Sequence, residues 1–238
     1  MSDAVVNVED LLFYYENKEL LSGLTFHLQP GEIVSLIGSS GSGKTTIFKI
    51  LAGILQSNTG KIALRGSIAY MTQEDLLLPW RTVLDNVLLP LELGKFSKNK
   101  NEAKKEAKEL LKELSLEGTE EQYPHQLSGG MRQRVSLGRA FVQRCPILLL
   151  DEPFASLDVM LREQMYGLVR RLSRKHGTTI LMVTHDFRDA LALSDRVLLL
   201  KKGKIEQEWK VPVHLEGDAV TESRLLREMK ESLHLSLK

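Results

Sequence analysis

The sequence predicts an α/β protein, in which a mostly parallel sheet carries a phosphate-binding loop and is interrupted by a mainly helical segment. A glycine-rich stretch at residues 38–45 lies between a strand-like apolar run and a helix-like run. A second apolar run, at residues 147–150, is followed directly by two acids, as is typical of a central parallel strand. Between these features, residues 76–145 have the composition and periodicity of helices.

The glycine-rich stretch fits the pattern G-x-x-x-x-G-K-[S/T] of the P-loop NTPases. Its glycines let the backbone curl so that consecutive N–H groups point at phosphate oxygens, and the next helix adds the positive end of its dipole. We expect Lys44 to reach the β- and γ-phosphates and the Thr45 hydroxyl to ligate Mg²⁺. The residues predicted to hold the nucleotide here are Gly38, Ser39, Ser40, Gly41, Ser42, Gly43, Lys44, Thr45 and Thr46.

Length and composition restrict the class of protein. The 238 residues suffice for one substantial core, and 42% of them are hydrophobic, which is ordinary for a soluble globular protein. The 32 Lys and Arg against 31 Asp and Glu give no electrostatic reason to expect nucleic acid as a partner. The single cysteine, Cys145, excludes an intramolecular disulfide bond. Because we see neither a signal peptide nor an apolar run near the ~20 residues that cross a bilayer, we expect a cytoplasmic protein.

The remaining elements follow from local patterns. Alternating apolar and polar residues predict an antiparallel N-terminal sheet with strands at residues 5–8 and 24–28, and aromatic side chains beside a polar turn at residues 11–18. Further strands are expected at residues 32–37, 60–66, 68–71, 147–150, 179–183, 196–200 and 204–209. Helices are expected at residues 46–52, 82–89, 98–114, 129–144, 159–175, 187–193 and 222–233.

We interpret residues 1–238 as one domain built from three parts. The nucleotide-binding α/β core is predicted at residues 1–75 and 146–210, and the inserted helical subdomain at residues 76–145. A short tail with one helix is predicted at residues 211–238, because four apolar side chains there share a helical face: Leu225, Leu226, Met229 and Leu233.

Two acids at the end of the apolar run 147–150 predict metal binding and hydrolysis. Asp151 is suited to hold Mg²⁺ through its water shell. Glu152 points elsewhere and is suited to polarise a water for in-line attack on the γ-phosphate. A nucleotide switch or a kinase needs the metal-binding acid, but a second acid directly after it favours hydrolysis.

A second candidate phosphate site lies far along the chain, at residues 127–133. Ser128 is a good helix N-cap, and Gly129 and Gly130 bring the start of a helix close to a ligand. Within one subunit this helix terminus cannot easily share the phosphates that the glycine-rich loop holds. We therefore predict that it completes the nucleotide site of a partner molecule.

Taken together, these motifs resemble the ATP-binding cassette (ABC) family over essentially the whole chain. The resemblance implies that Tyr15, or Tyr14 in its place, stacks on adenine, although such a tyrosine pair could instead be core or strand-face residues. It implies that Gln73 contacts Mg²⁺ and the attacking water, and that His185 touches the γ-phosphate. It also implies that Asp158 crosses a dimer interface, although this residue equally fits a helix N-cap.

Residues 77–87 and the short path from residue 60 to residue 70 look like cassettes of the nitrate/sulfonate/taurine importer group, which also takes up pyrimidine-type vitamin precursors. The resemblance implies a homodimer around two Mg·ATP, attached to integral membrane permease subunits at the inner face of the membrane and served indirectly by a solute-binding protein. Pro79 and Trp80 could grip a permease helix or simply pack within the insert.

Two other functions remain open at this stage. The chain could be a non-transport cassette that acts as a nucleotide-dependent module on nucleic acid or ribosomes. It could also be a phosphotransferase, although the pair Asp151 and Glu152 argues against that.

Overall fold

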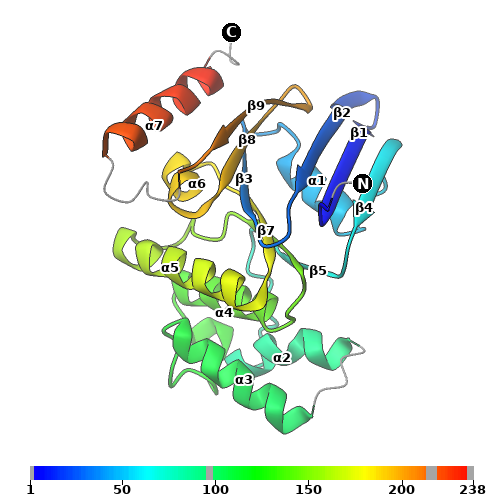
Figure 1. Ribbon diagram of the computed structural model, residues 1–238. Helices are drawn as coiled ribbons and strands as arrows, with labels where there is room; N and C mark the ends of the chain where they lie inside the picture. The colour runs from blue at the N-terminus through cyan, green and yellow to red at the C-terminus, as the bar shows by residue number, and fades with distance from the viewer. Residues whose placement is uncertain (1–2, 95–98, 213–218, 235–238) are drawn as a thin grey trace.

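The structure, a computed structural model, describes residues 3–94, 99–212 and 219–234, and two sheets organise this part of the chain (Figure 1). Within it, a six-stranded sheet runs in spatial order through β5 (Ile68–Met71), β6 (Ile147–Asp151), β7 (Thr179–Val183), β3 (Ile33–Ile37), β8 (Arg196–Lys201) and β9 (Lys204–Lys210). A three-stranded antiparallel sheet consists of β2 (Lys18–Leu28), β1 (Val6–Tyr15) and β4 (Thr59–Leu64). In the large sheet, β8 and β9 pair antiparallel and the other pairs are parallel.

The described residues form seven α-helices and one 3₁₀ turn. They are α1 (Lys44–Leu51), α2 (Val83–Leu93), α3 (Lys100–Glu113), the 3₁₀ turn η1 (Pro124–Gln126), α4 (Gly129–Phe141), α5 (Val159–His176), α6 (Phe187–Leu193) and α7 (Ala219–His234). A mainly helical segment thus separates β5 from β6. The predicted fold class, a P-loop NTPase core with an antiparallel N-terminal sheet and a helical insertion, is confirmed. No helix in the described ranges has both the length and the apolar composition that a membrane span requires.

The central strand β6 is buried on both faces. Ile147 and Leu149 pack with β1, β2 and α1, so α1 lies between the two sheets. Leu148 and Leu150 point the other way and pack with α2, α3, α4 and α5. Burial of both faces explains why the sequence of this strand is apolar without interruption.

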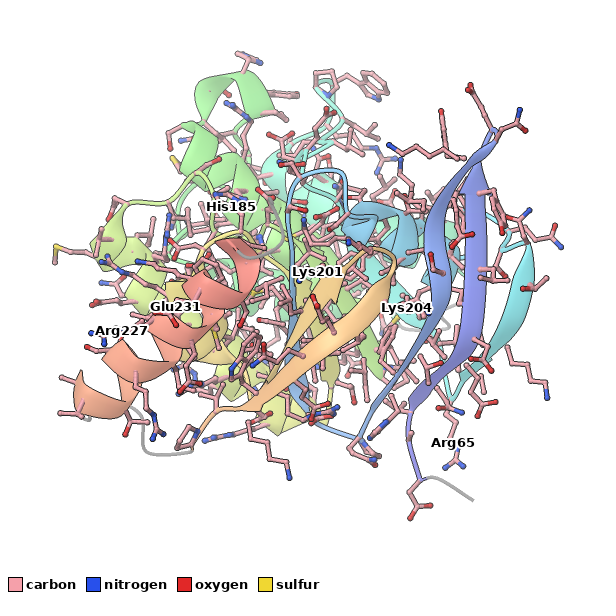
Figure 2. The ribbon with its side chains drawn as sticks, turned by 90° about the horizontal axis from the view of Figure 1, so that it is seen from above. Arg65, His185, Lys201, Lys204, Arg227 and Glu231 are labelled. Carbon is pink, nitrogen blue, oxygen red and sulfur yellow. The ribbon has the colours of Figure 1, made fainter. Side chains whose placement is uncertain are left out.

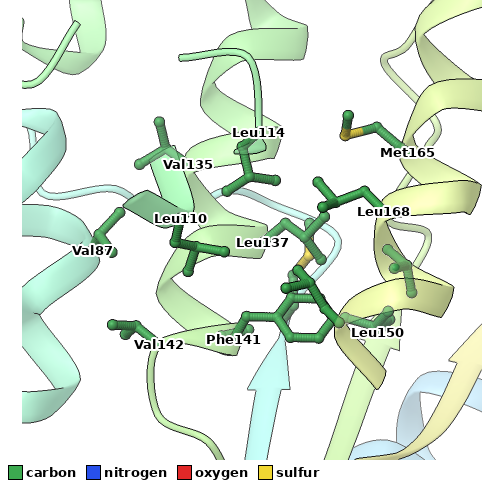
Figure 3. Close-up of a cluster of buried hydrophobic side chains, with 14 of the residues drawn as sticks. Val87, Leu110, Leu114, Val135, Leu137, Phe141, Val142, Leu150, Met165 and Leu168 are labelled. Atoms are coloured by element: carbon green, nitrogen blue, oxygen red, sulfur yellow. The ribbon is translucent and has the colours of Figure 1, made fainter. Parts of the chain in front are cut away.

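The insertion and the core share one hydrophobic cluster (Figure 3). Leu110 of α3, Phe141 of α4, Leu168 of α5 and Leu150 of β6 all belong to it, and all four are buried. The cluster therefore includes side chains from both sides of the predicted boundaries at residues 75/76 and 145/146. The division of the chain into subdomains stays a prediction.

The first strand is longer than its sequence pattern indicates. The pattern ends a strand at Val8, but β1 continues to Tyr15 and the turn after it is only Glu16 and Asn17. The register shifts between Val8 and Leu11, where Asp10 has a φ of 49°. This bulge interrupts the alternation of apolar and polar residues, so a pattern-based reading takes it as a strand end.

Strand order brings the predicted functional segments to one edge of the large sheet. Strands β5, β6, β7 and β3 are neighbours and run parallel, so their carboxyl ends lie side by side. Gln73 follows β5, Glu152 follows β6, His185 follows β7, and the glycine-rich loop follows β3. In open α/β sheets, this edge is where ligands bind.

Candidate nucleotide site

The loop between β3 and α1 contains positions that only glycine fits. Gly41 and Gly43 have φ values of 74° and 104°, which side chains rarely allow. A Cβ atom on Gly38 would lie 2.6 Å from the backbone oxygen of Leu200 in β8. Gly43 is also the N-cap of α1 and offers no side-chain cap, so the first N–H groups of this helix remain available to an anion.

The Lys44 side chain folds back into this loop and hydrogen-bonds to its backbone. Its Nζ donates to the backbone oxygens of Gly38 at 2.8 Å and of Ser39 at 2.9 Å. Burial lowers the pKa of the Lys44 ammonium, while the charges of Glu152 and Asp151 oppose that effect. A cation therefore lies at the centre of a loop of backbone N–H groups, as a site for phosphate requires.

Asp151 and Thr45 form an oxygen pair beside the loop. Asp151 is only 2% exposed, and the Thr45 side chain hydrogen-bonds to it. Burial raises the pKa of the Asp151 carboxyl, against the hydrogen bonds from Thr45 and Tyr70. Tyr70 Oη donates to Asp151 Oδ2 at 3.4 Å. Tyr70 was not among the predicted site residues, and its only signal is an aromatic hydroxyl three positions before Gln73.

Two predicted residues converge on the carboxylate of a third, Glu152. Gln73 Nε2 donates to Glu152 Oε2 at 3.3 Å, and His185 Nδ1 lies 3.1 Å from the same oxygen. Glu152 itself has a φ of 50°, a left-handed conformation that is uncommon for a residue other than glycine. Its N–H donates to the backbone oxygen of Val183 at 2.9 Å, which ties the turn to β7. Strained, well-held residues of this kind cluster at functional sites.

A pocket of about 220 Å³ connects the loop with Glu152 and His185. Its lining consists of Ile37, Gly38, Ser39, Ser40, Lys44, Glu152, His185, Phe187 and Leu233. Leu233 belongs to α7, which runs from Arg227 through Glu231 toward His185 (Figure 2). The C-terminal helix thus contributes an apolar side chain to the candidate site, which its amphipathic sequence pattern gave no reason to expect.

Tyr15 and Tyr14 end strand β1 differently. Tyr15 is 66% exposed, whereas the hydroxyl of Tyr14 donates to Glu19 Oε2 at 3.1 Å. Tyr14 is also exposed, at 40%, so both rings can be reached by a base, and the stacking role of Tyr15 stays a prediction.

The residues predicted to serve a partner's site face solvent. Ser128 and Gly129 are exposed, and Ser128 caps α4 by accepting from the N–H of Met131 at 3.3 Å. Asp158 caps α5 in the same way, accepting from Leu161 at 3.0 Å. Among the hydrogen bonds and ion pairs of the described residues, none joins residues 128–130 or Asp158 to the glycine-rich loop of the same chain.

Gln133 ends the predicted segment 127–133, but no separate role was predicted for its side chain. It is 5% exposed on α4, and its Nε2 donates to the backbone oxygen of Glu152 at 2.8 Å. The N–H of Ser156 donates to its Oε1 at 3.0 Å. A polar side chain on the buried face of a helix is the signal that could have identified it.

The residues present fit a magnesium ion that is held together with phosphate. Thr45, Gln73 and Asp151 offer hydroxyl, amide and carboxylate oxygens, which are the ligands that Mg²⁺ prefers. Within the described residues, no group of three His, Cys, Asp or Glu side chains could hold a metal ion by itself. The oxygens of a substrate must therefore complete such a site, as is usual for Mg²⁺ with nucleotides.

The sequence matches a known family over more than half of its length. The family model described as ABC transporter matches residues 21–155. An aliphatic sulfonates import ATP-binding protein of Burkholderia lata is 38% identical over 90% of this chain, and the chain covers 66% of that protein. The Corynebacterium glutamicum protein of the same name is 42% identical over 87% of this chain and is covered to 84%. The chain thus spans just under two thirds of the Burkholderia relative.

Solved structures share the fold. The dimeric structure of a bacterial ABC transporter cassette has a TM-score of 0.80 at 30% identity, over 87% of this chain and 99% of that one. A second dimeric structure of the same cassette, in a post-hydrolysis state bound to ADP and phosphate, has a TM-score of 0.79 at 31% identity, with the same coverage.

Proposed function

We propose that this chain, which belongs to the ABC transporter family, is the ATP-hydrolysing subunit of an importer and works as a pair of copies. Family membership confirms the resemblance inferred from the motifs. The observation that carries the proposal is the convergence of Gln73 and His185 on Glu152 beside the glycine-rich loop. An acid held from two sides next to a phosphate pocket is suited to activate water, which a phosphotransferase has to exclude.

The proposed reaction uses the loop and the carboxylate together. Lys44 turns from the loop carbonyls to the β- and γ-phosphates of ATP, and the N–H groups of the loop hold the same phosphates. Thr45, Asp151 and Gln73 would hold Mg²⁺, which would neutralise charge on the phosphate oxygens. Glu152 accepts a hydrogen bond from the attacking water, and His185 lies against the γ-phosphate.

In the proposed dimer, residues 128–130 bind the ATP that the other copy holds. Each copy would direct its exposed α4 N-terminus at the ATP held by the other copy, so that ATP lies between the two. The side chains beside Asp158 support an interface at this surface, because Val159 and Met160 are 71% and 76% exposed. The loop that holds Asp158 lies against α4, since a Cβ atom on Gly130 would be 3.2 Å from the backbone oxygen of Ser156.

The proposed contact with membrane subunits lies just after Gln73. Leu76 and Trp80 are 56% and 72% exposed, which is unusual for large apolar side chains and favours a binding role for Trp80. The same segment is fixed to α4, because Arg132 Nε contacts Asp75 Oδ2 at 3.0 Å and Arg139 donates to the backbone oxygen of Leu76 at 2.8 Å. A partner that moves this segment would therefore also move α4.

The relatives suggest the solute. Because proteins with the closely similar sequences above are named for import of aliphatic sulfonates, we propose this class as the cargo. The cassette itself would not select it, and that task would fall to the permease subunits and a solute-binding protein. The chain would work on the cytoplasmic side of the membrane, attached through the permease.

The central test replaces the proposed catalytic acid. Glu152→Gln should bind ATP but hydrolyse it about 10²–10⁴-fold more slowly, the usual contribution of a general base. It should also accumulate as a dimer in the presence of Mg·ATP, measured by size-exclusion chromatography with light scattering. Glu163→Gln, on the exposed surface of α5, is the matched control and should behave as wild type. A Glu152→Gln protein that stays monomeric with ATP would exclude the dimer.

A second experiment tests the importer and its cargo. The tagged chain is purified from membranes, and integral membrane proteins that accompany it are identified and reconstituted in vesicles with their solute-binding protein. ATP-dependent uptake of an aliphatic sulfonate supports the proposal. Uptake of nitrate or of a pyrimidine-type precursor alone rejects the proposed cargo, and salt-sensitive nucleic-acid binding without any membrane partner rejects the importer.

A further inference from the structure

The buried amide of Gln133 holds both ends of the turn that follows β6. Its donor is bonded to the backbone oxygen of Glu152 and its acceptor to the N–H of Ser156, at 2.8 Å and 3.0 Å. The side chain lies on α4 and is 5% exposed, so water cannot easily replace either partner. One side chain of α4 therefore fixes the backbone of the turn that begins with the proposed catalytic acid.

The turn needs such a support because it starts from a strained residue. Glu152 has a φ of 50°, a left-handed conformation that is unfavourable for a residue with a side chain. The bond that Gln133 donates to its carbonyl opposes rotation of this peptide group. The direction of the Glu152 side chain depends on that backbone, so its distances to Gln73 and His185 depend on Gln133 as well.

The same helix begins with the residues proposed to bind the partner's ATP. Gln133 is five positions after Ser128, about 7.5 Å along a helix at 1.5 Å per residue. A Cβ atom on Gly130 would lie 3.2 Å from the oxygen of Ser156 and 3.2 Å from Leu157 Cδ2, so the first turn of α4 packs directly on the same loop. The start of α4 thus contacts the second half of one short segment, residues 152–157, and Gln133 contacts both Glu152 at its beginning and Ser156 near its end.

We propose that Gln133 is a positioning residue that couples the two ATP sites of the dimer. The inference rests on the proposed function. There, the N-terminus of α4 binds the ATP of one site, while Glu152 of the same chain acts on the ATP of the other site. Gln133 links the parts of the chain that take part in these two events. When α4 binds the nucleotide held by the partner, Gln133 therefore positions the Glu152 carboxylate to activate water at the chain's own nucleotide.

The test separates positioning from folding and from binding. Gln133→Glu keeps an acceptor for the N–H of Ser156 but cannot donate to the Glu152 carbonyl. Gln133→Leu removes both bonds at similar volume and serves as a second variant if the charged one does not fold. Gln143→Glu is the matched control, because the Gln143 amide makes a local bond to the backbone oxygen of Arg139 at 3.2 Å.

The readout is the rate of ATP hydrolysis against ATP concentration. Wild type should show a Hill coefficient above 1, as two positively coupled sites do. In both Gln133 variants kcat should fall at least about tenfold, because the carboxylate is misplaced. Their half-saturating ATP concentration should stay within about threefold, and the Hill coefficient should fall to 1.

The outcomes are distinguishable. Gln133 variants that keep both the wild-type kcat and the wild-type Hill coefficient overturn the inference. So do variants whose kcat falls while the Hill coefficient is unchanged, and so does a Gln143→Glu control whose kcat falls as much as that of the Gln133 variants. The proposed function, and the coupling with it, is overturned if the wild type hydrolyses no ATP. It is also overturned if neither the wild type nor Glu152→Gln forms a dimer with Mg·ATP. A non-cooperative wild type that is an active dimer overturns the coupling alone.

Discussion

The close approach of Gly38 to β8 leads to a quantitative prediction. In Gly38→Ala the new Cβ atom would lie 2.6 Å from the oxygen of Leu200. An ordinary C···O contact is about 3.3–3.6 Å, so the two atoms must separate by roughly 0.7–1 Å. Leu200 is 1% exposed on a strand held between β3 and β9, so we expect the loop to move and β8 to stay.

Two measurements follow from this displacement. Overpacking of this kind costs about 1–3 kcal/mol. For a chain of this size that lowers Tm by roughly 2–12 °C, measured by circular dichroism without nucleotide. Hydrolysis should fall more steeply than stability, by about 10²-fold, because the displaced loop holds the phosphates.

A matched glycine provides the control for this prediction. Gly177 ends α5 with a φ of 63°, and a Cβ atom there would meet no other part of the protein within 4 Å, so Gly177→Ala adds backbone strain without a clash. It should lower Tm by a comparable amount and leave ATP hydrolysis intact. A Gly38→Ala protein that melts and hydrolyses ATP as wild type does would refute the argument, because the loop would then have room that the structure denies it.

Three further substitutions test the surroundings of the site. Asp151→Asn should raise Tm at neutral pH without nucleotide. Burial holds the pKa of Asp151 above its value in the unfolded chain, so the folded protein loses stability as pH rises from the unfolded pKa through the folded one, and Asn avoids this loss. The stabilisation of the protein by Mg·ATP should disappear in the same variant. Tyr70→Phe should raise the Mg²⁺ concentration for half-maximal hydrolysis by less than the roughly tenfold loss common for such supporting groups, because its bond to Asp151 is 3.4 Å long. Leu233→Asp should raise the Kd for ATP by about tenfold, because a carboxylate would then face the phosphate pocket. The control Leu226→Asp, on the same helix, should lower Tm without changing that Kd.

The sequence was most informative where chemistry requires a fixed local order of residues. The glycine-rich loop, the acids after β6 and the N-cap of α4 could be predicted because each is a short motif with one mechanical purpose. Strand β6 could also be predicted from its uninterrupted apolar run, because a strand buried on both faces needs no polar positions.

Features that depend on distant parts of the chain could not be predicted in the same way. The bulge at Asp10 hid half of β1, because it depends on pairing with β2 and not on the local pattern. The order β5-β6-β7 was equally hidden, although it is what brings Gln73 and His185 to the carboxylate of Glu152. Leu233 could not be expected at the phosphate pocket, because an amphipathic helix indicates that one face is covered but not by what.

The position of Glu152 in this fold suggests how small movements could control hydrolysis. Its left-handed backbone costs roughly 1–2 kcal/mol, and a typical hydrogen bond contributes about 1 kcal/mol. The bonds to the Val183 oxygen and from Gln133 are therefore together comparable to the strain they oppose. With one of them lost, the remaining bond of about 1 kcal/mol only equals the strain or falls up to about 1 kcal/mol short of it, so a shift of α4 that breaks the Gln133 bond should loosen the carboxylate between Gln73 and His185. Control of the reaction then needs no large conformational change within the chain, only a change in how firmly one turn is held.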